Sequence, residues 1–304
     1  MTGNQQALRL GIDLGGTKIA GVALGPGGRM LAEHRMPAPR HDYAATVGAI
    51  ADMVRELEED AGGQGSIGVG MPGSLSPSSG LVQNANSTWL NGRPFRRDLE
   101  AQIERPVRLA NDANCFALSE AVDGAGAGAR SVFGVILGTG CGGGLVLDGA
   151  LIDGPRGIGG EWGHNPLPWA EASEHPGPTC WCGRRGCVET WVSGPGLEAD
   201  HAKATGEQLS AEAIAARAAG GDAAALATLD RHASRLARGL ASVINIFDPE
   251  VIVLGGGLSK LAHLYAELPA LVAPYVLAEQ AQVVIKPPLW GDASGVRGAA
   301  WLWP

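Results

Sequence analysis

Apolar and polar positions along the chain predict one structural device that is used twice: a buried strand, a glycine-rich turn and a second buried strand. The first copy comprises a strand at Leu8–Ile12, a turn at Asp13–Lys18 and a strand at Ile19–Leu24, and the second comprises a strand at Val132–Leu137, a turn at Gly138–Gly144 and a strand at Leu145–Leu147. Short apolar runs bounded by glycines are typical of strands inside a core. An internal duplication of this kind predicts two similar domains that face a shared cleft.

The remaining pattern alternates helices with strands. We expect helices at Tyr43–Glu59 and Ala113–Val122, strands at Ser66–Met71, Val107–Ala110 and Val251–Leu254, and a polar loop from Pro72 to Pro94. Asp222 follows two glycines and is a predicted N-cap. The helix after it carries an apolar stripe at helical spacing, made of Leu226, Leu229, Ala233, Leu236, Leu240, Val243 and Phe247. We interpret this stripe as core packing.

Composition narrows the class of protein. A chain of 304 residues with 47 glycines and 5% aromatic residues is typical of a two-domain α/β enzyme with many tight turns. The net charge of −8, without a basic run, argues against nucleic acid or an anionic membrane as partner. Residues 1–10 lack the pattern of a signal segment, and the five cysteines indicate reduced thiols. We therefore expect a cytoplasmic protein that neither spans nor binds a membrane.

Three glycine turns follow predicted strands. Asp13-Leu-Gly-Gly-Thr-Lys18 lets backbone N–H groups approach an anion, although it is not a Walker A loop and could be an ordinary hairpin turn. Gly138–Gly143 matches GxGxxG, but the strand that follows it excludes a dinucleotide fingerprint and leaves a second phosphate cradle. Gly255–Ser259 forms a third turn with room for a nucleotide base.

Asn111-Asp112 stands where a predicted strand meets a helix. Asp is among the best N-caps, and from this pair alone capping is the favoured interpretation of Asp112. The alternative is a carboxylate general base, because strand ends commonly supply active-site groups. The paired glycine cradles favour this catalytic interpretation.

A cluster of thiols predicts a metal site. Cys180, Cys182 and Cys187 follow His164, and three thiolates with one imidazole suit tetrahedral Zn²⁺. Four protein ligands leave no position for an activated water, so the zinc would be structural. The alternative, three buried inert thiols, is less consistent with this tight spacing. The other two cysteines, Cys115 and Cys141, are interpreted as packed thiols.

Several polar residues near these motifs could recognise a sugar. Glu161 and Glu189 bracket the cysteine cluster, and the second ring nitrogen of His164 is free to face a ligand. Asn84, Asn86, Ser87 and Asn91 surround Trp89. Amides beside an indole suit a sugar's hydroxyls and its apolar face, although such a loop can equally be surface decoration.

Together these motifs resemble the ROK family of bacterial sugar kinases and repressors. The matching segments are GIDLGGTK (11–18), NANSTWLNG (84–92), RLANDANCFALSEA (108–121), LGTGCGGG (137–144), EWGH (161–164), CWCGRRGCVE (180–189) and VIVLGGG (251–257). The resemblance implies a two-domain ribonuclease H-like (actin/hexokinase-type) α/β ATPase fold with a central cleft. We expect residues 1–111 and 292–304 to form the small domain, and residues 112–291 to form a large domain with the zinc site.

The resemblance also implies roles for individual residues. Asp112 matches the base that deprotonates the sugar hydroxyl. Asn111, Glu161, His164 and Glu189 match sugar-binding residues, to which we add Asn86 and Asp112 itself. Asp13, Gly15, Gly16, Thr17, Lys18, Gly138, Thr139 and Gly140 match the phosphate turns, and Gly255, Gly256 and Gly257 lie by the adenosine. His164, Cys180, Cys182 and Cys187 match the ligands of a structural Zn²⁺, and Mg²⁺ is expected with ATP.

Within the family, the loop around Trp89 and the segment EWGHNPLPW look most like fructokinase of the manno(fructo)kinase type. We therefore expect ATP-dependent phosphorylation of fructose at O6, with mannose and glucose secondary. Glucokinase or N-acetylhexosamine kinase activity is the alternative. A sugar-responsive repressor would need a DNA-binding domain before the strand at Leu8, and a non-catalytic sensor would not need Asp112. A homodimer is expected, as is usual in such kinases.

Two features depart from the family pattern. The interval from His164 to Cys180 is long. Gly143 stands where we expect alanine or a larger apolar residue, which predicts a looser second turn.

Overall fold

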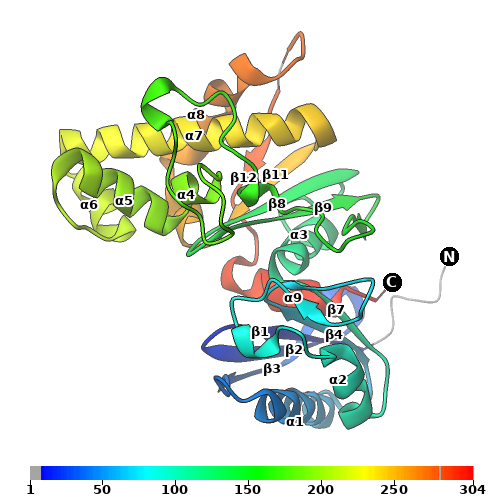
Figure 1. The fold of residues 1–304 in the computed structure, drawn as a ribbon. Coiled ribbons are helices and arrows are strands. Elements are labelled where there is room, and N and C mark those ends of the chain that lie inside the picture. The colour runs from blue at the N-terminus through cyan, green and yellow to red at the C-terminus, as the bar shows by residue number, and fades with distance from the viewer. Residues whose placement is uncertain (1–7, 281, 304) are drawn as a thin grey trace. The chain divides into compact units, whose positions relative to one another are not determined.

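The computed structural model describes residues 8–280 and 282–303, so the expectation for the first ten residues falls mostly outside it (Figure 1). The strands are β1 Arg9–Leu14, β2 Lys18–Leu24, β3 Met30–Pro37, β4 Ser66–Met71, β5 Ser74–Leu75, β6 Val82–Gln83, β7 Val107–Asn111, β8 Ser131–Leu137, β9 Cys141–Leu147, β10 Ala150–Leu151, β11 Val251–Gly255 and β12 Ile285–Lys286. The α-helices are α1 Tyr43–Ala61, α2 Phe95–Ile103, α3 Asp112–Val122, α4 Glu189–Val192, α5 Gly194–Thr205, α6 Ala211–Ala219, α7 Ala223–Phe247, α8 His263–Val272 and α9 Ser294–Ala300.

Two five-stranded sheets confirm the duplicated device. The first has the order β3-β2-β1-β4-β7, and the second has the order β10-β9-β8-β11-β12. In the first, β1 pairs with its hairpin partner β2 on one side and in parallel with β4 on the other. In the second, β8 lies between β9 and β11, and its pairing with β11 is parallel. The second turn is shorter than expected, because β9 already begins at Cys141.

The chain forms two compact units. The first contains residues 8–128, 144–159 and 289–303, and the second contains residues 129–143, 160–280 and 282–288. This division differs from the expected domain boundary at residue 111, because α3 belongs with the first unit. The reason is its close packing on α9, where a Cβ on Gly298 would collide with the backbone carbonyl of Cys115. Only glycine permits two helices to approach so closely.

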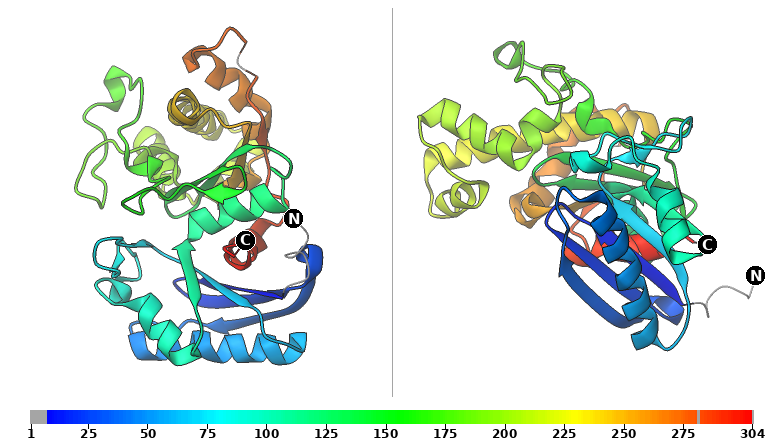
Figure 2. Two further views of the ribbon diagram at one scale, coloured as in Figure 1. Left: turned by 90° about the vertical axis from the view of Figure 1, so that its right-hand side faces the viewer. Right: turned by 60° about the horizontal axis from the view of Figure 1, so that its bottom comes forward.

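In the first unit, helices cover both faces of the sheet. Helices α1 and α2 lie on one face, while α9 and α3 lie on the other (Figures 1 and 2). Helix α1 begins at Asp42, whose side chain accepts a hydrogen bond from the Ala45 N–H at 2.9 Å, and it ends at Gly62, with a φ of 73°. Its apolar face buries Ile50, Met53 and Leu57 against the sheet, where α1 contacts β1, β2 and β3.

Helix α7 is the longest helix of the second unit. Asp222 caps it as predicted, with its side chain accepting from the Ala225 N–H at 2.9 Å. The predicted stripe is buried at Leu229, Ala233, Leu236 and Leu240. Leu226 is 43% exposed, so its assignment to the core is wrong. It lies in the first turn of the helix, where solvent is still accessible.

Buried ion pairs connect α7 to the long segment between His164 and Cys180. The Glu174 carboxylate, with a side chain 5% exposed, accepts hydrogen bonds from Arg235 at 2.9 Å and from Arg238 at 2.7 Å. Burial by itself would raise the pKa of Glu174, but the hydrogen bonds from Arg238 and Arg235 lower it to about 2. This long segment, noted from the sequence, therefore carries Glu174, whose ion pairs connect the segment to α7.

Replacing Glu174 with Gln is expected to lower the free energy of unfolding by about 3 kcal/mol, because the buried Arg238 loses its ion-pair partner and the buried Arg235 keeps only its ion pair with Asp200. Since the folded pKa is depressed, this stabilisation is present near neutral pH and is lost as the pH falls from about 4 towards 2. Urea unfolding at pH 7 and pH 3 measures both effects. Glu212→Gln, at an exposed position on α6, is the matched control. Equal stability of the two variants at pH 7 would contradict the role of these ion pairs.

None of the helices in the described part of the chain is both long enough and apolar enough to cross a membrane.

Candidate functional site

The first glycine turn places Asp13 and Lys18 at the end of the β1–β2 hairpin. The turn is closed by a hydrogen bond from the Gly15 N–H to the Lys18 carbonyl at 3.0 Å, and Gly16, Thr17 and Lys18 are exposed. Their backbone and side-chain donors are therefore accessible to an anion, as the sequence predicts.

Asp13 lies at the end of β1 against two glycines. A Cβ added at Gly70 or Gly295 would lie 3.6 or 3.5 Å from its carboxylate oxygens, so glycine at these positions leaves room beside the carboxylate. Burial and, to a smaller extent, the negative charge of Asp112 together raise the pKa of Asp13 to about 6, although Lys18 opposes the shift. Asp13 and Asp112 are thus close enough to interact electrostatically.

Asp112 is the first residue of α3, immediately after β7. The helix cap is Asn111, whose Oδ1 accepts from the Ala113 N–H at 2.9 Å, while its Nδ2 donates to the Gly73 carbonyl at 3.1 Å. Asp112 is therefore not the N-cap, which removes the main alternative to the catalytic interpretation. Its carboxylate reaches solvent, yet desolvation by the surrounding protein raises its pKa despite a hydrogen bond from Ala113. A carboxylate with a raised pKa is a stronger base.

Cys115 and Cys141 are packed thiols, as expected. Both are buried and free. Burial raises the pKa of Cys115 well above its usual value, and the charges of Asp13 and Asp112 add to the shift. Burial, together with the negative charge of Glu189, likewise raises the pKa of Cys141 well above its usual value. Both thiols stay neutral and unreactive at physiological pH.

The four predicted zinc ligands converge in the second unit. One ligand atom from each of His164, Cys180, Cys182 and Cys187 lies within 4.8 Å of all the others. Cys180 Sγ is 3.6 Å from His164 Nδ1, and Cys182 Sγ is 3.7 Å from Cys187 Sγ. Zinc–sulfur bonds of about 2.3 Å and zinc–nitrogen bonds of about 2.0 Å in a tetrahedron separate ligand atoms by about 3.5–3.8 Å. The four residues therefore fit Zn²⁺, and Nδ1 is the ring nitrogen that faces the cluster.

Glu189 connects this cluster to the second glycine turn. Its Oε2 accepts from the Cys141 N–H at 3.0 Å, and its Oε1 accepts from Trp181 Nε1 at 2.8 Å. A Cβ on Gly140 would lie 2.9 Å from Oε2, so glycine at this position gives the carboxylate its space. Glu189 is therefore held in one orientation by two donors. The contribution of Trp181 was not anticipated from the sequence, because an aromatic residue between two cysteines has no spacing signal of its own.

Gly143 contradicts the expectation of a looser second turn. A Cβ there would come within 2.7 Å of the Trp162 indole and 2.9 Å of the Phe133 ring. Trp162 is buried, packs edge-on to Phe133 and donates from Nε1 to the Gly142 carbonyl at 3.1 Å. The indole fills the space that a larger residue would occupy, so glycine here makes the packing tight.

The other predicted residues lie on loops. Glu161 is exposed immediately before the 3₁₀ turn Trp162–His164. Gly255 ends β11, and Gly256, with a φ of 78°, packs so closely on the backbone of Leu137 that a Cβ would clash. The Gly138 carbonyl accepts from the Gly194 N–H at 2.8 Å, which ties the second turn to α5.

The loop around Trp89 has both structural and exposed residues. Asn91 bonds the backbone N–H and carbonyl of Ala85, each at 2.9 Å, and so holds the loop closed. Asn84 and Asn86 are exposed. Of the predicted amides, Asn86 is thus accessible to a ligand, whereas the Asn91 side chain already hydrogen-bonds the backbone of its own loop.

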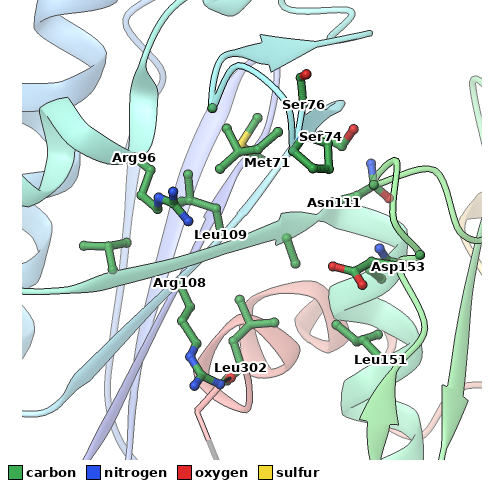
Figure 3. A pocket seen from close by; sticks show the side chains of 18 residues that line it. Met71, Ser74, Ser76, Arg96, Arg108, Leu109, Asn111, Leu151, Asp153 and Leu302 are labelled. Atoms are coloured by element: carbon green, nitrogen blue, oxygen red, sulfur yellow. Dashed lines mark hydrogen bonds between the residues drawn. The ribbon is translucent and has the colours of Figure 1, made fainter.

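A cavity of about 470 Å³ lies along β7 in the first unit. Ser74, Asn111 and Asp153 lie along one side of it, and Arg96 and Leu109 lie on the other (Figure 3). Among its lining residues, only Asn111 was predicted as a site residue, and Asp112 is not among them. Ser74 begins the short strand β5 and Asp153 lies on a loop, and neither belongs to a motif that can be recognised in the sequence.

Comparison with known proteins places these motifs in one family. A family model described as the ROK family matches residues 9–304. N-acetyl-D-glucosamine kinase of Photobacterium profundum is 42% identical over 296 residues, which cover 96% of this chain and 98% of that protein.

Two solved structures are similar along nearly the whole chain. The ROK hexokinase of Thermus thermophilus has 34% sequence identity and a TM-score of 0.86, with 97% of each chain covered. A ROK family glucokinase from Streptomyces griseus, solved in complex with glucose and AMPPNP, has 28% identity and a TM-score of 0.75, with 96% of this chain and 98% of that chain covered. The actin/hexokinase-type α/β fold expected from the sequence is confirmed.

Proposed function

The chain belongs to the ROK family and is an ATP-dependent sugar kinase, and from this premise we propose that its preferred acceptor is N-acetyl-D-glucosamine. The observation that carries the proposal is the 42% identity with an N-acetyl-D-glucosamine kinase over 98% of that protein's length. A further relative of that name, from Pectobacterium atrosepticum, is 40% identical. These relatives favour the N-acetylhexosamine alternative over the fructose that the loop around Trp89 led us to expect.

Asp112 is the proposed general base. Its carboxylate takes the proton from the primary hydroxyl at C6 as that oxygen attacks the γ-phosphorus of ATP, and ADP leaves. The raised pKa of Asp112 strengthens it as a proton acceptor. The hydrogen bond from Ala113 fixes the orientation of the carboxylate. Phosphoryl transfer depends mainly on such positioning and on stabilisation of charge.

The glycine turns are the proposed phosphate sites. Lys18, Thr17 and the backbone of Gly16 are exposed at the first turn, where they can donate to phosphate oxygens. Mg²⁺ would accompany ATP and would neutralise phosphate charge, and Asp13 is the acidic side chain of this turn. We keep Gly138–Gly140 as the second phosphate turn and Gly255–Gly257 as the adenosine turn.

Acceptor recognition is assigned to Glu161, His164, Glu189, Asn86 and Asn111. Carboxylates and a neutral imidazole accept hydrogen bonds from sugar hydroxyls, and amides can both donate and accept. Glu189 is oriented before any ligand binds, because both of its oxygens already have a donor. Preorganisation of this kind lowers the cost of ordering a site when a ligand binds.

A structural Zn²⁺ is proposed at His164, Cys180, Cys182 and Cys187. When bound, the ion supplies cross-links within the segment that carries Trp181 and Glu189, and it keeps His164 Nδ1 engaged so that Nε2 faces outward. We also propose that the chain forms a homodimer, as the family resemblance implies.

A coupled ADP-release assay tests the acceptor. Values of kcat/KM are measured for N-acetylglucosamine, N-acetylmannosamine, glucose, mannose and fructose. N-acetylglucosamine is expected to give the highest value, at least about tenfold above fructose, because a site built around an acetamido group is incomplete without it. A higher value for fructose or glucose would overturn the acceptor assignment and leave the kinase class intact.

Activity is expected to fall as the pH drops through about 6, because burial raises the pKa of Asp13 to about 6 and also raises that of Asp112. Both carboxylates act in their ionised forms, so protonation removes activity at a higher pH than for an ordinary aspartate. Because the two charges interact, the fall in kcat/KM at acid pH reports the titration of Asp13 and Asp112 together and not that of either residue alone. The profile of kcat/KM from pH 5 to pH 8 measures it, with circular dichroism at pH 5 as the control for folding. An acid limb near pH 4 would contradict the assignment.

A further inference from the structure

Trp181 is a large aromatic residue left exposed at a site that otherwise consists of metal ligands and sugar-binding candidates. It stands between Cys180 and Cys182, and 69% of its side chain is accessible to solvent. An indole buries more apolar area than almost any other side chain, so exposure to this extent is costly unless a ligand covers the ring. The segment around it is held by the cysteine cluster, and the side chain is therefore not at the tip of a free loop.

Two contacts direct this side chain. Its Nε1 donates to Glu189 Oε1 at 2.8 Å, and its ring meets the His164 ring edge-on with centroids 4.9 Å apart and planes at 85°. The indole thus touches two of the three residues of the second unit that are assigned to sugar hydroxyls, Glu189 and His164. The other oxygen of Glu189 is held by the Cys141 N–H at 3.0 Å.

We propose that Trp181 is an acceptor-recognition residue, which orients Glu189 through its indole N–H and covers the apolar face of the bound sugar with its ring. This inference rests on the proposed function of the site. Sugars present C–H groups on one face and hydroxyls at the rim, so an indole beside a fixed carboxylate matches both. A metal ligand role is excluded, because the indole N–H is only a donor.

Two substitutions separate the role of the indole N–H, which orients Glu189, from the role of the ring, which covers the sugar. Trp181→Phe keeps an aromatic face and removes the N–H, while Trp181→Ala removes both. A hydrogen bond to a charged group is worth about 1.5–3 kcal/mol, which corresponds to a rise in the KM for the sugar of about 10- to 100-fold for Trp181→Phe. The KM for Trp181→Ala is expected to rise further, while the KM for ATP stays within about twofold.

Trp169 provides the matched control. It is also an exposed tryptophan of the second unit, 51% accessible, but within the described residues its ring packs on Tyr275 and not beside Glu189. Trp169→Phe is expected to keep the KM for the sugar. Zinc content is measured in all variants, because a structural role for Trp181 would change metal binding as well as sugar binding.

The experiment uses whichever of the five sugars the wild-type protein phosphorylates fastest, so failure of the N-acetylglucosamine assignment does not affect its outcome. Quenching of tryptophan fluorescence by that sugar, present in wild type and Trp169→Phe and lost in Trp181→Phe, supports a ring that contacts the acceptor. An unchanged KM for the sugar in Trp181→Ala would overturn the proposal. Loss of zinc from Trp181→Phe would overturn it too, because the residue would then act through the metal loop.

Discussion

Replacing Asp112 with Asn is expected to lower kcat by about 10²- to 10⁴-fold, while the KM for the sugar changes little. The amide has the shape of the carboxylate but cannot accept the proton from the sugar hydroxyl. Its Oδ1 can still accept from the Ala113 N–H, which the carboxylate does at 2.8 Å, and the helix cap at Asn111 is untouched. The fold of α3 should therefore persist, and the loss should appear in the chemical step.

Steady-state kinetics of Asp112→Asn with the best acceptor measure this loss. Asp52→Asn is the control, because Asp52 is an exposed residue of α1 in the same unit and pairs only with its neighbour Arg55 in the described structure. Thermal unfolding of both variants checks the fold. A kcat within about threefold of wild type would show that Asp112 is not the base.

Replacing Cys182 with Ser is expected to abolish zinc binding and to lower kcat/KM by at least about tenfold, since the loss of one ligand opens a four-ligand site. Without the metal, the segment that carries Trp181 is no longer cross-linked, and Glu189 loses one of its two fixed donors, the Trp181 indole N–H. The free energy of unfolding should fall as well, because metal binding is coupled to folding. Elemental analysis of the purified protein, expected to give about one zinc ion per wild-type chain, measures the first effect.

Cys141→Ala is the matched control for this substitution. Cys141 is a buried free thiol near Glu189, but unlike Cys182 it lies outside the four-residue cluster, and alanine keeps the backbone N–H that holds Oε2. This variant should retain zinc. Wild-type protein that contains no zinc, or a Cys182→Ser variant with full zinc content, would rule out the metal site.

The parts of the fold that could be predicted from sequence are those with local signals. Apolar runs and glycines located β1, β2, β8 and β11, and Asp222 was recognised as a cap because its side-chain bond reaches only three residues ahead. The ligand cluster was predictable because its three cysteines lie close together in the chain and the chemistry of all four residues is distinctive. Such features depend on neighbours in the chain.

The parts that could not be predicted depend on contacts between distant segments. Gly143 was misjudged because the Trp162 indole that fills its space lies on another loop. The placement of α3 depends on Gly298, which follows it by nearly two hundred residues. Glu174 was missed because its partners are on α7, and no local pattern distinguishes a buried glutamate from an exposed one.

A competition experiment tests most directly whether N-acetylglucosamine is the preferred acceptor. N-acetylglucosamine, glucose and fructose at equal concentration are offered together with limiting ATP, and the phosphorylated products are separated and identified by mass spectrometry. The product ratio equals the ratio of kcat/KM values and does not depend on the active fraction of the preparation. We expect N-acetylglucosamine 6-phosphate to predominate by about tenfold or more. A predominance of fructose phosphate or glucose phosphate would contradict this assignment.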